Sequence, residues 1–270
     1  MTETVKFSSV QKTTLISLLT LALLASTGGL VLTAQELTGP EIIEKVDSAS
    51  TPETVNAILT MTLINEEGKE RVREMEAWNR GDDDSVMVFR EPGDVAGTAL
   101  LKTTNDEGNE STYLYLPSLD ITKEMSQKAK NQKFMGSDFT YDDLGSRKVD
   151  EYTYELLRKE SSDGGTIYVV EGEAKDPEIS GYSRVRSWVS EKNWKPEKVE
   201  YYDLDGKLLK VQRNSRIEKI GDFWVVKEMT MENKQTGSET ILTWKDYEIN
   251  TELPEDIFNP DRLPELTEEE

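Results

Sequence analysis

The sequence predicts a mainly β protein with about ten to twelve antiparallel strands, and two observations carry this prediction. Apolar and polar residues alternate in short segments. Leu59, Met61 and Leu63, for example, alternate with Thr60 and Thr62, which gives the strand one apolar face. Turn signals containing glycine separate such segments at the close spacing of hairpins. The pattern is typical of a β-sandwich or a β-barrel.

The predicted organisation is a signal peptide followed by one domain. No charged residue occurs between Lys12 and Glu36, so residues 1–34 are predicted to be a secretory signal cleaved after Ala34. The alternative cleavage positions are Ala25 and Gly28. Because about 20 apolar residues can cross a bilayer, an uncleaved anchor is a further alternative. The remaining residues, 35–270, contain no Pro/Ser-rich linker and predict a single domain with an acidic C-terminal tail.

The first predicted element after the signal is a short amphipathic helix over residues 40–49. Ile42, Ile43 and Val46 share one face at helical spacing. Thr38 precedes the helix as a candidate N-cap.

The predicted strands then follow in order, joined by short turns. One strand ends at Pro92, because proline cannot donate to a strand ladder. The final segment is acidic and rich in proline, and we expect it to fray. The predicted hairpin turns lie at residues 67–68, 106–109, 163–165, 192–193, 205–206 and 236–237.

The composition excludes several classes of function. The chain has neither Cys nor His, which excludes a thiol nucleophile, a Cys/His zinc site and a Ser-His-Asp triad. Its formal net charge of −21 opposes binding to nucleic acid. The acidic residues Asp138, Asp142 and Asp143 leave acid–base catalysis or Ca²⁺ binding as an alternative, although their spacing does not match an EF-hand loop. We predict no enzyme, no cofactor and no metal.

Residues 130–146, "KNQKFMGSDFTYDDLGS", form a predicted cover over an apolar opening. Large apolar side chains stand among polar residues and small turn residues, which is typical of a functional loop. The expected structure is a short helix that Ser137 or Asp138 caps, with a sharp entry at Gly136 and a left-handed end at Gly145. The side chains expected to point down onto the opening are Phe134, Met135, Phe139 and Leu144.

A strongly curved sheet of this size either fills its inside with side chains or encloses a cavity. Large, soft side chains at the candidate inner positions favour a cavity for variable apolar ligands, since methionine adapts to different shapes. The alternative is that these residues are ordinary core. The candidate inner residues are Leu59, Met61, Trp78, Met87, Phe89, Tyr113, Tyr115 and Met229.

Three segments, "FREPGDVAGTALL", "YLYLPSLD" and "KFMGSDFTYDDL", together with the closing "LPEDIFNP", carry a family resemblance. The exported chain resembles the outer-membrane lipoprotein-sorting family, the LolA-like carriers, and in particular the branch associated with RND/MMPL-type exporters. This resemblance implies an incomplete, strongly curved antiparallel β-barrel of the LolA/LolB type, with a short N-terminal helix and a helical loop closing its mouth. It departs from the branch in "DITKEMSQKAKNQK", which contains Lys where several Arg are usual.

The resemblance also implies a function. The expected protein is a monomeric periplasmic carrier that holds acyl chains of lipoproteins or lipids, with an inner-membrane transporter and an outer-membrane acceptor as partners. An arginine holds the lid in LolA itself. Arg80 and Arg90 are both candidates here, and no local motif distinguishes them. The alternative function is an accessory subunit of an exporter that carries no cargo of its own.

Overall fold

The computed structural model describes residues 36–105, 107–145, 149–254 and 256–267. The chain divides into Met1–Glu36 and Leu37–Glu270, and all helices and strands below belong to the second unit. The predicted signal peptide and its cleavage position lie outside the described residues. Within the described part of the chain, no helix is both long enough and apolar enough to span a membrane.

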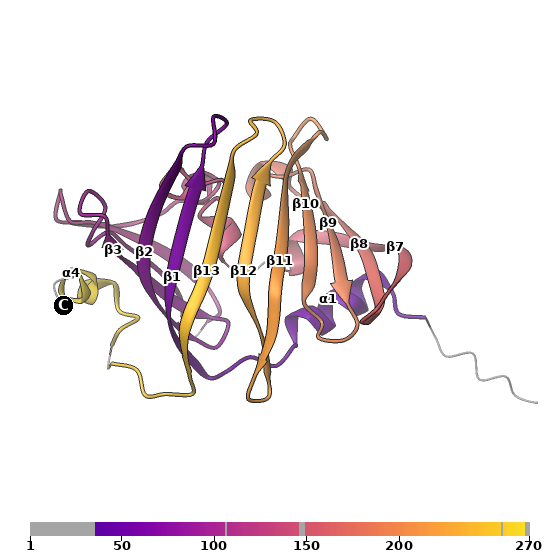
Figure 1. Ribbon diagram of the computed structural model, residues 1–270, viewed down its shortest axis with the longest axis horizontal. Helices are drawn as coiled ribbons and strands as arrows, with labels where there is room; N and C mark the ends of the chain where they lie inside the picture. Colours follow the sequence, from indigo (N-terminus) through magenta and orange to yellow (C-terminus); the bar gives the residue numbers. More distant parts are fainter. Residues whose placement is uncertain (1–35, 106, 146–148, 255, 268–270) are drawn as a thin grey trace, which may run out of the picture. The chain divides into compact units, whose positions relative to one another are not determined.

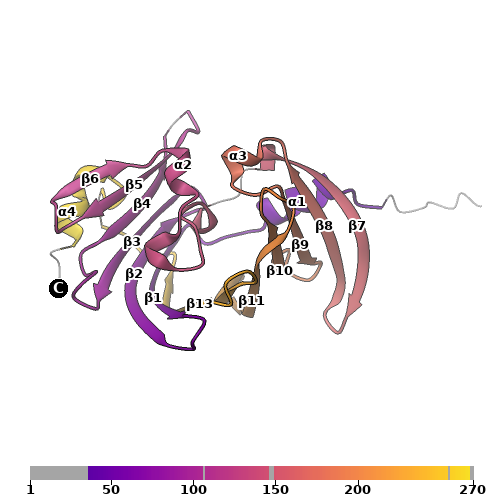
Figure 2. The ribbon, with the colours of Figure 1, turned by 90° about the horizontal axis from the view of Figure 1, so that it is seen from above.

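Thirteen strands of the described chain form one antiparallel sheet. They are β1 Thr54–Ile64, β2 Glu70–Arg80, β3 Asp84–Glu91, β4 Ala99–Thr104, β5 Glu110–Leu116, β6 Ile121–Glu124, β7 Tyr152–Ser162, β8 Gly165–Ala174, β9 Arg184–Ser190, β10 Pro196–Tyr202, β11 Leu208–Ile220, β12 Phe223–Asn233 and β13 Glu239–Ile249. Their order is β6-β5-β4-β3-β2-β1-β13-β12-β11-β10-β9-β8-β7. The central strands face the viewer in Figure 1, and Figure 2 shows the sheet bent into a trough. Because β6 and β7 are its two ends, the sheet does not close, which confirms the predicted incomplete barrel.

The predicted hairpins are confirmed, since each predicted turn joins two strands that pair as neighbours. The sheet has one strand more than the upper end of the prediction. A tight turn at Gly221, whose φ is +58°, joins β11 to β12 as the separate strands that the sequence predicts. The edge strand β6 is short and fully exposed, so it carries no apolar alternation that a sequence could reveal.

The predicted helix is observed as α1, Gly39–Asp47. The Thr38 side chain accepts from the Glu41 backbone N–H, and the Glu41 carboxylate accepts from the Thr38 backbone N–H, which completes a capping box. Ile42 and Ile43 are buried against apolar residues of β8 and β9, and α1 lies inside the trough in Figure 2.

The two faces of the sheet bury different clusters. On the outer face of β2–β5, the segment of residues 256–266 packs through Ile257, Phe258 and Leu263, and it ends in the 3₁₀ turn Pro260–Arg262 and helix α4, Leu263–Leu266. Leu263 is fully buried. The apolar residues of this segment therefore dock on the sheet, whereas the last residues of the predicted frayed tail, 268–270, lie outside the described part of the chain.

Candidate functional site

The candidate site is the concave face of the sheet, called the interior below. Its apolar cluster contains residues of every strand except β6 and is rich in methionine. Met61, Met75 and Met231 are fully buried, and Met87 and Met229 pack beside them half-buried. A methionine-rich surface can adjust to side chains or ligands of different shape.

A loop called the plug segment, residues 131–145, covers the interior. Its first half is a narrow hairpin-like turn, in which the Phe134 N–H donates to the Phe139 carbonyl at 2.7 Å. At its tip Met135 has a φ of 47° and Gly136 a φ of 77°. Both values lie in the left-handed region, which glycine tolerates and methionine rarely adopts. Gly136 therefore makes a sharp turn, but not into the helix cap that the sequence predicted.

The plug segment presses two phenyl rings into the interior. Phe139 is 0% exposed and Phe134 is 1% exposed. The Phe134 ring centroid lies 5.7 Å from that of Phe89 on β3 and 5.3 Å from that of Tyr141. Met135 and Leu144 pack half-buried against the same cluster. These side chains fill the part of the interior that lies beneath the plug segment.

The predicted helix over "FTYDDL" is wrong in its details. Only the 3₁₀ turn Asp142–Leu144 forms, and Gly145 is extended with a φ of −89° rather than left-handed. Asp138 caps no helix, because its carboxylate accepts from the Ser238 and Thr240 hydroxyl groups of the neighbouring hairpin at 2.7 and 3.1 Å. The Ser137 hydroxyl instead accepts from the Phe139 N–H within the tight turn.

Asp143 lies within this 3₁₀ turn and bonds reciprocally with Thr140. Its carboxylate accepts from the Thr140 N–H, and the Thr140 hydroxyl accepts from the Asp143 N–H. The same carboxylate forms a buried ion pair with Lys210 of β11 at 2.5 Å, with the two side chains 3% and 2% exposed. Lys210 also donates to the carbonyl of Asp138 at 3.1 Å. This pair fastens both halves of the plug segment to the sheet.

The groups around this ion pair are strongly desolvated. The Tyr182 hydroxyl donates to Asp143 at 2.8 Å. Burial, followed by the Asp143 charge, raises the pKa of Tyr182 well above its ordinary value, so the phenol stays protonated and keeps donating. Burial also raises the pKa of the neighbouring Asp142, and the charges of Asp143 and Glu151 add to that increase.

A second ionic group lies under the other end of the plug segment. Glu110 accepts from Lys102 at 3.2 Å and from Lys130 at 3.0 Å, and all three side chains are nearly buried. Burial raises the pKa of Glu110, but the two ammonium groups outweigh burial and lower it overall. Lys130 ends helix α2, Gln127–Lys130, which leads into the plug segment.

Neither arginine considered as a holder of the cover contacts the plug segment in a described hydrogen bond. Arg80 bonds Asp84 and stacks on Phe258, while Arg90 bonds Glu76 and the Leu266 carbonyl. Those contacts tie β2 and β3 to the outer C-terminal segment.

Arg73 of β2 is the arginine that reaches the plug segment. It donates to the Met135 carbonyl at 2.5 Å. Sequence reasoning missed both Arg73 and Lys210. Their plug contacts lie 62 and 67 residues away along the chain, respectively, so no local motif marks either residue.

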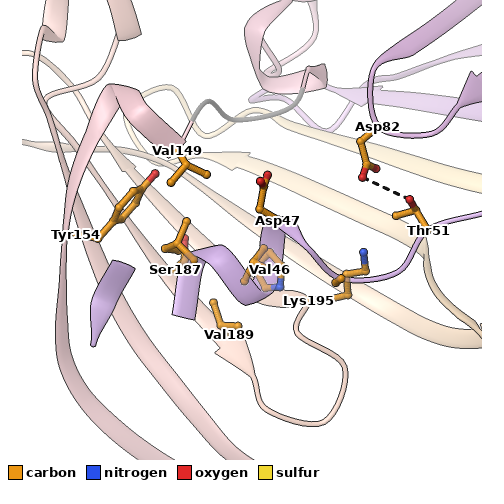
Figure 3. A pocket seen from close by; sticks show the side chains of 12 residues that line it. Val46, Asp47, Thr51, Asp82, Val149, Tyr154, Ser187, Val189 and Lys195 are labelled. Atoms are coloured by element: carbon orange, nitrogen blue, oxygen red, sulfur yellow. Dashed lines mark hydrogen bonds between the residues drawn. The ribbon is translucent and has the colours of Figure 1, made fainter. Parts of the chain in front are cut away.

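Helix α1 covers a second part of the interior and leaves a hollow beside it (Figure 3). The hollow has a volume of about 180 Å³. Val46 of α1, Val149, Tyr154 of β7 and Val189 of β9 supply its apolar wall. Val189, Ser187 and the interior residue Val185 alternate along β9, so this hollow opens on the same face as the plugged region.

The polar end of this hollow carries Lys195, Asp82 and Thr51. The Thr51 hydroxyl donates to Asp82 at 3.4 Å, as Figure 3 shows. Burial lowers the pKa of Lys195, and the Asp82 charge opposes that shift in part. The hollow therefore combines an apolar wall with one charged end.

Gly39→Ala tests how closely α1 must approach β7. A Cβ at Gly39 would lie 2.8 Å from the Glu155 backbone nitrogen and from the Tyr154 backbone carbon, and the strand backbone cannot yield easily. We expect a loss of about 1–3 kcal/mol of stability and faster amide hydrogen exchange in α1. Gly93→Ala is the matched control, because a Cβ there meets no atom within 4 Å. Equal exchange rates in the two variants would contradict this close-contact account.

The structure places most of the predicted site residues in the interior, although binding by them stays a prediction. Three residues lie elsewhere: Trp78, Tyr113 and Tyr115 belong to the outer cluster under the C-terminal segment. Their assignment to the interior is corrected, because Trp78 pairs with Val86 and Tyr113 with Leu101, which face outward. The residues in or against the interior are Leu59, Met61, Met87, Phe89, Phe134, Met135, Phe139, Leu144 and Met229.

The three acids of the plug segment do not converge. Asp138 faces the hairpin between β12 and β13, Asp143 faces Lys210, and Asp142 lies toward Lys130. Among the described residues, no group of three or more His, Cys, Asp or Glu could hold a metal ion. The arrangement fits fastening of the cover better than acid–base chemistry.

The chain is similar to the crystal structure of an outer membrane lipoprotein-sorting protein domain from Vibrio parahaemolyticus. The two share 32% identity with a TM-score of 0.77, over 84% of this chain and 98% of that chain. This chain belongs to the family of outer membrane lipoprotein-sorting proteins. A family model described as "Uncharacterized protein" matches residues 81–265. Among curated proteins none matches the chain.

Two further solved structures have a similar fold. A DUF1329 family protein from Desulfovibrio piger shares 29% identity with a TM-score of 0.77, over 83% of this chain and 97% of that one. A LolA superfamily protein from Nitrosomonas europaea shares 24% identity with a TM-score of 0.66, over 84% and 99%. The second likeness supports the fold alone.

Proposed function

We propose that this LolA-like protein is a non-catalytic periplasmic carrier. It holds acyl chains of lipoproteins or lipids in the interior and delivers them towards the outer membrane, receiving them from an inner-membrane transporter and passing them to an acceptor. The sorting role named for the Vibrio parahaemolyticus relative supports this proposal.

The observation that carries the proposal is the way the plug segment is fastened. Among the described residues, every hydrogen bond between this segment and the sheet uses a side chain. The plug segment can therefore leave the interior without breaking a strand ladder. Departure of Phe134 and Phe139 would uncover a continuous apolar face, and an acyl chain would restore the burial that the two rings lose, about 25 cal/mol per Å² of apolar surface.

The filled interior also favours one alternative. If Phe134 and Phe139 never leave, the protein is an accessory subunit of an exporter without cargo of its own. That protein would present its sheet edges and loops to partner proteins.

Native mass spectrometry combined with lipid extraction separates these two functions. For protein purified from its exporting host without detergent, we expect adducts of acyl-chain mass that an organic solvent removes. A fluorescent fatty-acyl probe should then bind the stripped protein. If the protein carries no extractable lipid and does not bind the probe, the carrier proposal fails and the accessory function remains.

A further inference from the structure

A second hollow lies at the rim of the interior, beside the tip of the plug segment. It has a volume of about 300 Å³, and its lining includes Leu63, Lys69, Arg71, Lys133 and Gly136. A Cβ at Gly136 would meet no atom within 4 Å, so the space beside the tip is open. It is called the rim hollow below.

The rim hollow concentrates positive charge in an acidic protein. The whole chain has 53 acidic and 32 basic residues, yet Lys69, Arg71 and Lys133 all line this space. Cross-strand partners share a face, and Arg71 pairs with Leu63 while Arg73 pairs with Met61. Both guanidinium groups therefore stand on the interior side of β2.

These charges are incompletely neutralised. Within the described residues, the side chains of Lys69 and Arg71 make no ion pair and no hydrogen bond. Burial lowers the pKa of Arg73, and repulsion from Arg71 adds to that decrease. The fixed charge nearby thus favours an added anion.

The two acids that line the rim hollow leave the charges of Lys69 and Arg71 uncancelled, although Asp138 neutralises Lys133 through an ion pair at 3.3 Å. Asp138 is 5% exposed and already accepts from Ser238, Thr240 and Lys133. Glu239 pairs with Ile64 in the ladder between β1 and β13, and Ile64 alternates with the inward-facing Leu63. The Glu239 side chain therefore belongs to the outer face.

We propose that the rim hollow binds the anionic head group, a phosphate or a carboxylate, of the amphiphile whose tail lies in the interior. Arginine matches such groups because its planar fork donates two parallel hydrogen bonds. Leu63 links the two regions, since it lines the rim hollow and also belongs to the interior cluster. This inference rests on the proposed carrier function and specifies the chemical class of its cargo.

Isothermal titration calorimetry with two amphiphiles of equal tail length tests the inference on the full chain. Dodecyl phosphate carries the anion, and 1-dodecanoylglycerol is neutral. We expect the parent protein to bind dodecyl phosphate about tenfold or more tightly than 1-dodecanoylglycerol, with the preference shrinking at high salt. Arg71→Gln should lower the dodecyl phosphate affinity about tenfold and leave 1-dodecanoylglycerol within about twofold.

Arg158→Gln on β7 is the matched control, because Arg158 is exposed and paired with Glu160 away from the rim hollow. It should change neither affinity. Equal affinities for the two amphiphiles in the parent, or a phosphate preference that survives Arg71→Gln, overturns the head-group site while leaving the carrier function intact. Inorganic phosphate that binds as tightly as dodecyl phosphate also overturns it, since the site would then hold a free anion. If neither amphiphile binds, both the carrier function and the head-group site fail.

Discussion

Lys210→Met is expected to lower the free energy of unfolding by about 3–5 kcal/mol. The change leaves the Asp143 carboxylate buried without its counter-ion, and that carboxylate is only 2% exposed. Urea denaturation should report the loss. Amide hydrogen exchange should accelerate first in the plug segment, because Lys210 holds both Asp143 and the Asp138 carbonyl.

Two further variants show whether the buried pair is the cause. Lys207→Met breaks an exposed pair with Asp205, whose side chains are 74% and 79% exposed, and should change stability little. The double variant Asp143→Asn with Lys210→Met removes the uncompensated charge and should recover at least half of the loss. A double variant no more stable than Lys210→Met alone would show that packing around Lys210, rather than charge, fastens the plug segment.

Phe139→Ala is expected to cost about 3–5 kcal/mol of stability, because it empties a fully buried site. The same change should tighten binding of a fluorescent fatty-acyl probe. If the interior binds acyl chains as proposed, the plug segment and an acyl chain compete for it, so weakening the closed form raises the population that can bind.

Leu119→Ala is the control for this second prediction, because Leu119 is 62% exposed and should have almost no effect on either measurement. The decisive outcome is one in which thermal stability and probe affinity do not change together. If Phe139→Ala melts much earlier than the parent but binds the probe with unchanged affinity, then Phe139 is ordinary core, and any acyl chain lies elsewhere, for example beside α1.

Much of the fold could be predicted from the sequence, because its signals are local. Glycine turns and two-residue alternation mark the hairpins, and Thr38 with Glu41 marks the start of α1. The fully exposed β6 offered no such signal, and neither did the C-terminal segment, whose docking depends on a distant apolar surface.

The faces of β2–β5 were harder to assign for a physical reason. Both faces of these strands are covered, the inner one by the plug segment and the outer one by the C-terminal segment, so large apolar residues occur on both. Trp78 and Met87 look equivalent in sequence, and only the strand register separates them. The fastening of the plug segment also escaped prediction, since Lys210 and Asp143 meet only in the folded chain.

The unclosed sheet has a consequence for the size of the cargo. In a closed barrel, the number of strands and their stagger fix the interior diameter. Widening such a barrel requires breaking hydrogen bonds between strands. Here β6 and β7 end the sheet without pairing to each other. The two margins can spread apart by a small change of twist at each strand, while every ladder stays intact. If the protein is the proposed carrier, its interior could then widen to hold hydrocarbon chains of different thickness.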